Sequence, residues 1–555
     1  MILRGLVVLL VVLVAAITYP GTMLVSLWVS LAQPANPTTA APQGDLPWLH
    51  VEHPADGRPY IADDQGRVVL LRGAIPASLL EFGPATQPLN PIDPSAYSAG
   101  KCPPNAADSK YPPLCQSDIQ AMAALGFNSV RLPISWSILE PRRGQFDMSY
   151  VDRVSQVVEW ARSLRMYVIV DMHQNAYSHY IPDADPSVDL RFNSGAPAWA
   201  TITDGFPSHV YSHERELNPA VFEATTNFWY DRDGIEDEYI KAVAVLVDRF
   251  KDDSTVAGFG LYNEPWPGWN LDPGFDDLLL FPFYRRVIDA ITGVADGVPC
   301  WTGFVMPAAC GYRDLGVHDR RHLMFLDTGL SREVTDFPTH LATPFTTYPN
   351  IVLALHAYTH IYTFDYLLHL SRDSYPWGGY EQSYAFAERE ARAMRAALFV
   401  SEFGNNPDDD SSILRNQLLE EERHDVGYAF WTWKETGGAG AWGMFDSTTG
   451  CLRPQREAML ASPYPKATAD RAVAFHYDSS NGAFRLQATG IPGDPTTVVY
   501  VPKEVAGEIT SSGGASLVVA SDSADGSRLA FATPTGGSFA VEIAPAPLRL
   551  RGCTA

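Results

Sequence analysis

The segment Val256-Ala-Gly-Phe-Gly-Leu-Tyr-Asn-Glu-Pro-Trp266 is a short apolar run that ends abruptly in Asn263 and Glu264. Further apolar, β-branched runs also end in polar or aromatic residues, at 128–133, 166–171, 351–356, 398–402 and 427–433. Stretches such as 150–164 and 239–250 lie between these runs and carry apolar residues at helical spacing. About 400 residues of this alternation, from 46 to 465, predict a closed (β/α)8 TIM barrel.

The ends of the predicted strands carry polar side chains. In a barrel of this kind, the carboxyl ends of the strands meet at one face, where catalytic residues gather. Buried polar groups cost free energy, so such a set at one face indicates a functional site. The residues at these ends are Arg131, Asp171, His173, Asn263, Glu264, His356, Tyr358, Glu402 and Trp431.

Two of these residues have the context that hydrolysis of a glycosidic bond requires. Glu264 precedes a proline and a tryptophan, and Glu402 lies between Val400 and Phe403, so neither glutamate belongs to a polar face. A retaining glycosidase uses one carboxylic acid and one carboxylate, about 5 to 5.5 Å apart. The two contexts together favour catalysis over a solvated surface charge, the usual state of a single glutamate.

Six segments, in order along the chain, resemble glycoside hydrolase family 5 of clan A. They are Val130-Arg-Leu-Pro133, Asp171-Met-His173, Asn263-Glu-Pro265, His356-Ala-Tyr358, Glu402-Phe-Gly404 and Trp431-Thr-Trp433. The resemblance implies a (β/α)8 barrel and a retaining mechanism. Glu264 would be the acid/base and Glu402 the nucleophile.

The same resemblance implies roles for the neighbouring residues. Asn263 would bond the 2-hydroxyl of the sugar, Arg131 and Tyr358 would orient Glu402, and His173 and His356 would line the subsite of the cleaved sugar. Trp431 would be the stacking floor of that subsite. A cation or hydroxyl near the nucleophile keeps it ionised, and its charge raises the pKa of Glu264, which we therefore expect to stay protonated.

Five segments look more narrowly like the endoglycoceramidases, which cut between a glycan and ceramide. They are 133–144, 171–178, 195–199, 263–268 and 462–465. Asn175 stands where that group has an acidic residue, so recognition of the first sugar by Asn175 would differ. The resemblance implies an endo-β-glycosidase acting on glycosphingolipids. A family 5 polysaccharide endo-β-glucanase or mannanase, and a glycan-binding protein on an inactive barrel, are the alternatives.

The two ends of the chain differ from the barrel segment. Residues 1–32 contain Arg4 and a long apolar run, which predicts a signal peptide or a membrane anchor, and 33–45 is a linker rich in Pro, Thr and Ala. Both predict a chain that is secreted or anchored on the outer face of the membrane. Residues 466–555 contain short strands between Gly, Ser, Asp and Pro clusters, which predict a small C-terminal β-sandwich.

Composition and cysteines limit the partners. The net charge is -24 and no run of Lys and Arg occurs, so a nucleic acid is excluded as a partner. We expect a monomer that acts on a glycan or glycolipid, with contact to a membrane surface and without metal or organic cofactor. Short spacing favours the disulfides Cys102–Cys115 and Cys300–Cys310, which leaves Cys451 and Cys553 as a third pair.

Overall fold

The computed structural model describes the barrel, the C-terminal sheet and most of their connections. The described residues are 46–81, 102, 110–181, 193–211, 214–270, 274–294, 313–338, 344–345, 348–371, 379–407, 411–437, 441–521 and 526–553. The predicted signal or anchor (1–32), the linker (33–45) and the predicted Cys300–Cys310 pair lie outside these ranges. Within them, every helix is too short or too polar to cross a bilayer.

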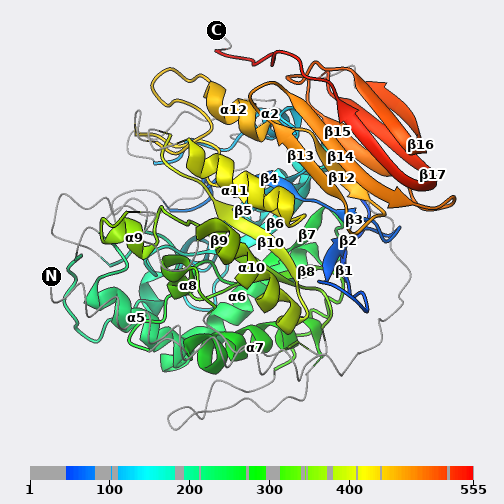
Figure 1. Ribbon diagram of the computed structural model, residues 1–555. Helices are drawn as coiled ribbons and strands as arrows, with labels where there is room; N and C mark the ends of the chain where they lie inside the picture. Colours follow the sequence, from blue (N-terminus) through cyan, green and yellow to red (C-terminus); the bar gives the residue numbers. More distant parts are fainter. Residues whose placement is uncertain are drawn as a thin grey trace.

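Eight parallel strands close into a barrel, which confirms the predicted fold (Figure 1). The strands, in order around the barrel, are β4 (Arg72–Ala74), β5 (Ser129–Ser135), β6 (Tyr167–His173), β7 (Val256–Gly260), β8 (Leu323–Asp327), β9 (Ile351–Ala357), β10 (Ala397–Phe403) and β11 (Gly427–Phe430). Strand β11 pairs with β4 and closes the ring. Of these eight, β4 and β8 were not predicted.

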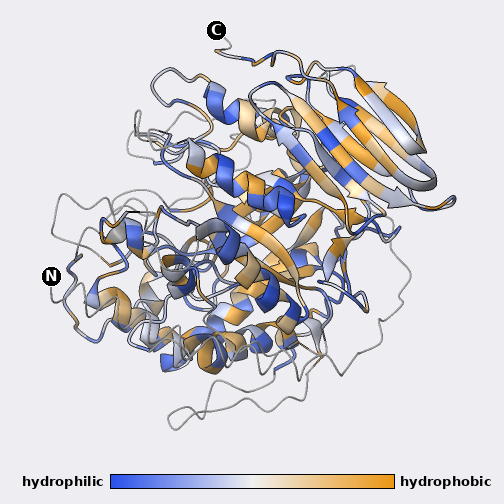
Figure 2. Cartoon of the chain, viewed as in Figure 1, coloured by the Kyte–Doolittle hydropathy of each residue, from blue (hydrophilic) through white to orange (hydrophobic). Residues whose placement is uncertain are grey.

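Helices surround the barrel and connect its strands. They are α2 (Gln116–Ala124), α3 (Trp136–Leu139), α4 (Met148–Ser163), α5 (Pro219–Trp229), α6 (Ile235–Phe250), α7 (Phe281–Thr292), α8 (Leu330–Thr335), α9 (Phe364–Leu367), α10 (Gly379–Met394), α11 (Ser412–Arg423) and α12 (Pro454–Leu460). Short helical turns η3 (Ala198–Ala200), η4 (Arg232–Gly234) and η5 (Asp276–Leu280) lie in the loops. The helices carry both hydrophilic and hydrophobic residues, whereas β10 is largely hydrophobic (Figure 2). Such helices bury one face against the barrel.

Side chains alternate between the inside and the outside of the barrel wall. In β6, Tyr167 and Ile169 belong to the inner core, whereas Val168 and Val170 pack in the layer between strands and helices. This period of two places the next inward positions, Asp171 and His173, above the apolar inner core. The sequence of one strand thus builds both the floor of the barrel and the polar layer above it.

The second sheet is antiparallel, as predicted. It contains β1 (His50–Glu52), β2 (Tyr60–Ala62), β3 (Val68–Val69), β12 (Tyr464–Thr468), β15 (Thr497–Val501), β17 (Arg528–Ile543), β14 (Ala483–Gly490) and β13 (Ala474–Asp478), with β16 (Ile509–Ser521) paired to β17. Strand β3 pairs with β12. Residues 50–69 therefore extend the C-terminal sheet, although the sequence placed them with the barrel.

Strand β17 joins two halves of this sheet. Its first residues pair with β15 and its last with β14, while β16 pairs along its length. Residues 528–543 thus form one continuous strand rather than separate short ones. Its register with β16 shifts between Gly513 and Ala515, where such an irregularity bends a hairpin. Side chains of β13, β14, β15 and β17 share one core, and all nine strands belong to one sheet.

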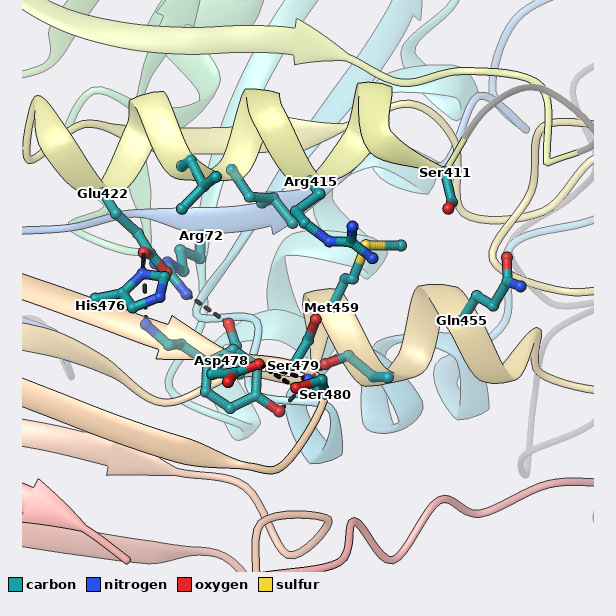
Figure 3. A pocket seen from close by; sticks show the side chains of 15 residues that line it. Arg72, Ser411, Arg415, Glu422, Gln455, Met459, His476, Asp478, Ser479 and Ser480 are labelled. Carbon is teal, nitrogen blue, oxygen red and sulfur yellow. Dashed lines mark hydrogen bonds and ion pairs between the residues drawn. The ribbon is translucent and has the colours of Figure 1, made fainter. Parts of the chain in front are cut away.

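The sheet packs on the side of the barrel that carries α11 and α12 (Figure 1). A cavity of about 620 Å³ lies between these helices and β13, and Arg415 points into it (Figure 3). At its edges, Nδ1 of His476 lies 2.8 Å from Glu422, and Arg72 donates to Ser462 at 2.8 Å. The contact of His476 in β13 with Glu422 in α11 therefore joins the sheet to the barrel at the edge of the cavity.

Two disulfides close loops in the described residues. Cys102 is bonded to Cys115, and Cys451 to Cys553, which confirms two of the three predicted pairs. The second bond ties the end of the chain to the loop after β11.

Candidate active site

The inward-facing residues at the carboxyl ends of the strands form one polar layer. Arg131 comes from β5, Asp171 and His173 from β6, Asp327 from β8, His356 from β9 and Glu402 from β10. All six are at most 5% exposed. The fold therefore gathers, in one buried place, side chains that are up to 271 residues apart in sequence.

An irregularity in β10 turns Glu402 into this layer. Val400 pairs with Leu355, but Glu402 pairs with His356, so Ser401 is one extra residue in β10. Without this bulge, the strict period of two would direct Ser401 inward and Glu402 toward the helices. The bulge thus selects which of the two side chains faces the site.

The two glutamates face each other closely. A carboxylate oxygen of Glu264, one of Glu402 and a ring nitrogen of His356 all lie within 4.8 Å of one another. This spacing falls near the separation of retaining glycosidases, and well below the 6.5 Å or more of inverting ones. Glu264 is hydrogen-bonded to His356, and Glu402 is hydrogen-bonded to Arg131. We therefore interpret the three residues as an acid–base site.

Arg131 is the centre of the network. It donates to Glu402 Oε2 at 2.7 Å, to Asn263 Oδ1 at 2.7 Å and to Asp171 Oδ1 at 3.0 Å. Burial alone would lower the pKa of Arg131, but the surrounding carboxylates, Asp171 first, outweigh burial and raise it. Arg131 therefore stays charged, and it contacts Glu402, the residue that the family resemblance implies it orients. Gly260 makes room for this arrangement, because a Cβ there would lie 2.2 Å from Asp171 Oδ1.

Tyr358 supplies the second contact of Glu402. Its hydroxyl donates to Oε1 at 2.8 Å, so both carboxylate oxygens of Glu402 accept a hydrogen bond. The ring of Tyr358 also makes a T-shaped contact with Tyr362 and a tilted contact with Trp442, with ring centroids 5.1 and 6.2 Å away. Tyr358 thus lies beside Glu402, where we expected it.

Glu264 is held through its backbone and by His356. Its φ is 42°, a left-handed conformation that is uncommon for glutamate. Its amide donates to Asp327 at 3.2 Å, and its carbonyl accepts from Gln174 at 2.7 Å. These two contacts fix the turn after β7, and the Glu264 carboxylate then lies 3.0 Å from Nδ1 of His356.

The pKa directions of the glutamates differ from the sequence-based expectation. Burial would raise the pKa of Glu264, but the hydrogen bond and charge of His356 outweigh it and lower that pKa. Burial, together with the charge of Glu264, raises the pKa of Glu402. Asp327, Glu333 and Glu402 raise the pKa of His356 well above its usual value against the effect of burial. The expected raised pKa of Glu264 was wrong because the sequence does not reveal its contact with a charged histidine.

Three further predicted residues line or flank this centre. Nδ1 of His173 lies 3.0 Å from a carboxylate oxygen of Asp171, and Nε2 of His173 lies 3.5 Å from the amide nitrogen of Asn263. The ring of Trp431 is parallel to that of His173, with centroids 5.8 Å apart. Asn175 pairs through its backbone with Ser194, and its buried Oδ1 lacks a hydrogen bond within the described residues. The structure therefore brings His173 and Trp431 to the site, whereas Asn175 contacts neither glutamate.

Two site residues were missed. Asp327 ends β8 and lies 3.1 Å from Nε2 of His356 and 3.5 Å from Arg131. Glu333 lies in α8, and its Oε1 is 3.4 Å from Nδ1 of His356. The run Leu323-Met-Phe-Leu-Asp327 has the same strand-then-acid pattern as its neighbours and could have revealed the first. No pattern marks Glu333, which reaches the site from a six-residue helix.

A family model and several relatives match this chain. The sequence model of Cellulase (glycosyl hydrolase family 5) matches residues 105–437, more than half of the 555 residues. Endoglycoceramidase I of Rhodococcus hoagii (strain 103S) is 26% identical over 497 residues, covering 84% of this chain and 84% of that protein.

Solved structures agree with these matches. A crystal structure of endogalactoceramidase superposes with a TM-score of 0.68 at 26% identity, and covers 90% of this chain and 100% of its own. Endo-glycoceramidase II from Rhodococcus sp., as its lactosyl-enzyme intermediate, superposes with a TM-score of 0.66 at 25% identity, covering 88% and 99%. The barrel, its polar layer and these matches agree: the chain belongs to glycosyl hydrolase family 5 and is a glycoside hydrolase.

Proposed function

We propose that this enzyme is a retaining endo-β-glycosidase that releases intact glycans from glycosphingolipids. The observation that carries the retaining mechanism is the spacing of at most 4.8 Å between the carboxylates of Glu264 and Glu402. That spacing leaves too little room for a water molecule to attack from the far side of the sugar. The existence of a solved relative as its lactosyl-enzyme intermediate supports this proposal.

In this mechanism Glu402 attacks the anomeric carbon while Glu264 protonates the leaving oxygen. A glycosyl-enzyme forms on Glu402, and Glu264 then removes a proton from the water that hydrolyses it. Arg131 and Tyr358 each donate a hydrogen bond to one carboxylate oxygen of Glu402. These two bonds keep the carboxylate in the orientation required for attack. The amide of Asn263 lies beside His173, where a sugar hydroxyl would bind.

The glycosphingolipid substrate is supported by similarity to endoglycoceramidases along most of the chain. We propose the same location as the sequence suggested, outside the cytoplasm and at a lipid surface, with a monomer as the active form. Exposed aromatic residues support contact with lipid: Phe206, Tyr211 and Trp269 are 42%, 53% and 49% exposed. Trp269 lies five positions after Glu264, and Phe206 packs against its ring at 5.8 Å.

A panel of glucosyl-, galactosyl- and lactosylceramide and a ganglioside tests the substrate. Wild-type enzyme should release ceramide and an intact glycan from at least one of them. Glu264→Gln and Glu402→Gln should lose this activity, whereas Glu421→Gln, a buried glutamate on α11, should retain it. Hydrolysis of soluble β-glucans without any ceramide release would replace this proposal by the glucanase alternative.

The stereochemistry of the product tests the mechanism. NMR during the first minutes of hydrolysis should show the β-anomer of the released sugar. The α-anomer as first product would exclude a covalent intermediate on Glu402.

A further inference from the structure

Glu333 and Glu264 share one nitrogen of the same histidine. Nδ1 of His356 lies 3.0 Å from an oxygen of Glu264 and 3.4 Å from an oxygen of Glu333. Glu333 is 3% exposed and lies one turn into α8, directly after the end of β8. Its neighbour Arg332 is turned away, toward Glu390 at 3.0 Å. The contact of Glu333 with His356 is therefore not diverted by the adjacent guanidinium.

The carboxyl groups around His356 outnumber the positive charges, so some of these carboxyl groups stay protonated. Five carboxyl groups belong to this network: Asp171, Glu264, Asp327, Glu333 and Glu402. Arg131, His356 and His173 are at most three positive charges against them. A buried site with excess negative charge retains protons on the carboxyls that have the fewest compensating partners. Burial and the charge of Glu264 raise the pKa of Glu333 well above its usual value, so Glu333 is the carboxyl group that holds such a proton.

We propose that Glu333 is a positioning residue for the reaction, which stores a proton beside Nδ1 of His356 and delivers it through that nitrogen to Glu264. The step is a transfer of one proton. The Nδ1–H of His356 moves to the carboxylate of Glu264, and the carboxylic acid of Glu333 reprotonates Nδ1. Glu333 ends as the carboxylate, Glu264 as the acid, and the charge of His356 is unchanged.

This transfer reconciles the contacts of Glu264 with the chemistry that Glu264 must perform. Glu264 is ionised beside His356, yet it must hold a proton when the glycosidic oxygen leaves. Because the charge of Glu264 also raises the pKa of Glu402, protonating Glu264 makes ionisation of the nucleophile easier. Asp327, 3.1 Å from Nε2 of His356, favours the charged histidine before and after the transfer. The inference rests on the proposed function, since it assigns the proton source of that same acid.

The test compares Glu333→Gln with wild type on two glycosides of the sugar that the ceramide panel identifies. One carries octanol and the other 2,4-dinitrophenol as leaving group. Octanol needs protonation, so kcat/KM for this substrate should fall about 10- to 100-fold, and its alkaline limb should move about one pH unit lower. Dinitrophenolate leaves without a proton, so its kcat/KM should stay within about twofold of wild type.

Controls separate this role from a structural one. Glu421→Gln also removes a buried carboxyl, from α11, and should leave both pH profiles unchanged. An unshifted alkaline limb for Glu333→Gln on the octyl glycoside overturns the proposal, as does an equal loss on both substrates. The ceramide panel with Glu264→Gln reports separately: full activity there refutes the proposed function itself, whatever Glu333→Gln does.

Discussion

At the residue scale, the site is an arrangement of donors around two carboxylates. Glu402 receives a hydrogen bond on each oxygen, whereas Glu264 is paired with one charged histidine. Hydrogen bonds to charged groups stabilise by roughly 1.5 to 3 kcal/mol each, so single donors matter for both orientation and ionisation. The difference in partners, rather than the type of residue, distinguishes the two glutamates.

Removal of the Tyr358 hydroxyl tests this view. Tyr358→Phe should lower kcat/KM by about 10- to 100-fold, the equivalent of one hydrogen bond to a charged group. The pKa of Glu402 should rise further, because its ionised form loses a donor, so the acid limb of the pH profile should move to higher pH. The measurement is kcat/KM against pH.

Tyr362→Phe is the matched control for Tyr358→Phe. Its ring lies 5.1 Å from that of Tyr358 and 6.1 Å from Trp442, but no hydrogen bond links its hydroxyl to Glu402. We expect an unchanged acid limb for this variant. The same shift in both variants would show that the hydroxyl of Tyr358 has no special role.

At the element scale, the contact of β7 with its neighbours requires glycine. An ideal Cβ on Gly258 would lie 2.0 Å from the carbonyl oxygen of Leu323 in β8. Gly258→Ala therefore forces two hydrogen-bonded strands apart, and overpacking of this kind costs about 1 to 3 kcal/mol. Urea unfolding should show this loss, with the remaining folded enzyme still active.

Gly260→Ala should affect activity more than stability. Its Cβ would meet the Oδ1 atom of Asp171, the end of a side chain that can rotate away from Arg131. We expect a smaller loss of unfolding free energy than for Gly258→Ala, but a larger loss of kcat/KM. A Gly260→Ala enzyme with normal kcat/KM would contradict the role given to Asp171.

The junction of α10 and α11 predicts a pH-dependent stability. Nδ1 of His424 lies 3.0 Å from a carboxylate oxygen of Glu388 in α10. Arg58 donates a hydrogen bond to the backbone carbonyl of His424 at 2.8 Å. The bonds to Glu388 and Glu420 overcome burial and raise the pKa of His424 from 6.5 to about 9. Because the pKa of His424 is higher in the folded than in the unfolded state, the charged histidine stabilises the folded state fully below pH 6.5. This contribution to the free energy of unfolding is lost as the pH rises through about 9.

His424→Gln should therefore flatten the fall in melting temperature between pH 6.5 and pH 9. His318→Gln is the control, because its pair with Asp314 lies on the surface with the histidine side chain 57% exposed. A wild-type slope that survives in His424→Gln would assign the pH dependence to other groups.

At the scale of the whole molecule, the two ends of the described chain are fixed to different parts of the fold. Strand β3 pairs with β12 of the C-terminal sheet, and Cys553 is bonded to Cys451 in the loop after barrel strand β11. This bond closes a loop with a sequence separation of 102, against 13 for Cys102–Cys115. In the chain-entropy description, a loop of about 100 residues stabilises by about 4.7 kcal/mol and one of 15 by about 3.

The double variant Cys451→Ser, Cys553→Ser should lose more unfolding free energy than Cys102→Ser, Cys115→Ser. Urea unfolding without reductant measures both, and we expect a difference of about 1 to 2 kcal/mol. An equal or reversed order would show that local contacts at the short loop dominate the entropy of the long one.

The sequence by itself determined the class of fold and most of the site. Apolar runs that end in polar residues are the signature of parallel strands, and Arg131, Asn263, Glu264, His356, Tyr358 and Glu402 all lie where this pattern placed them. The Cys102–Cys115 disulfide and the change to strands without helices after 465 were also readable, because spacing and residue type carry them locally, whereas Cys451–Cys553 followed only as the remaining pair.

The tertiary structure alone decided the rest. It decided that Ser401 is an extra residue in β10, that Glu333 reaches His356 from a neighbouring helix, and that residues 50–69 join the C-terminal sheet. It also decided the pKa of Glu264, which depends on a histidine 92 positions away. Sequence patterns report which face of its own strand a residue occupies, whereas charge and register depend on neighbours that only folding brings within a few ångströms.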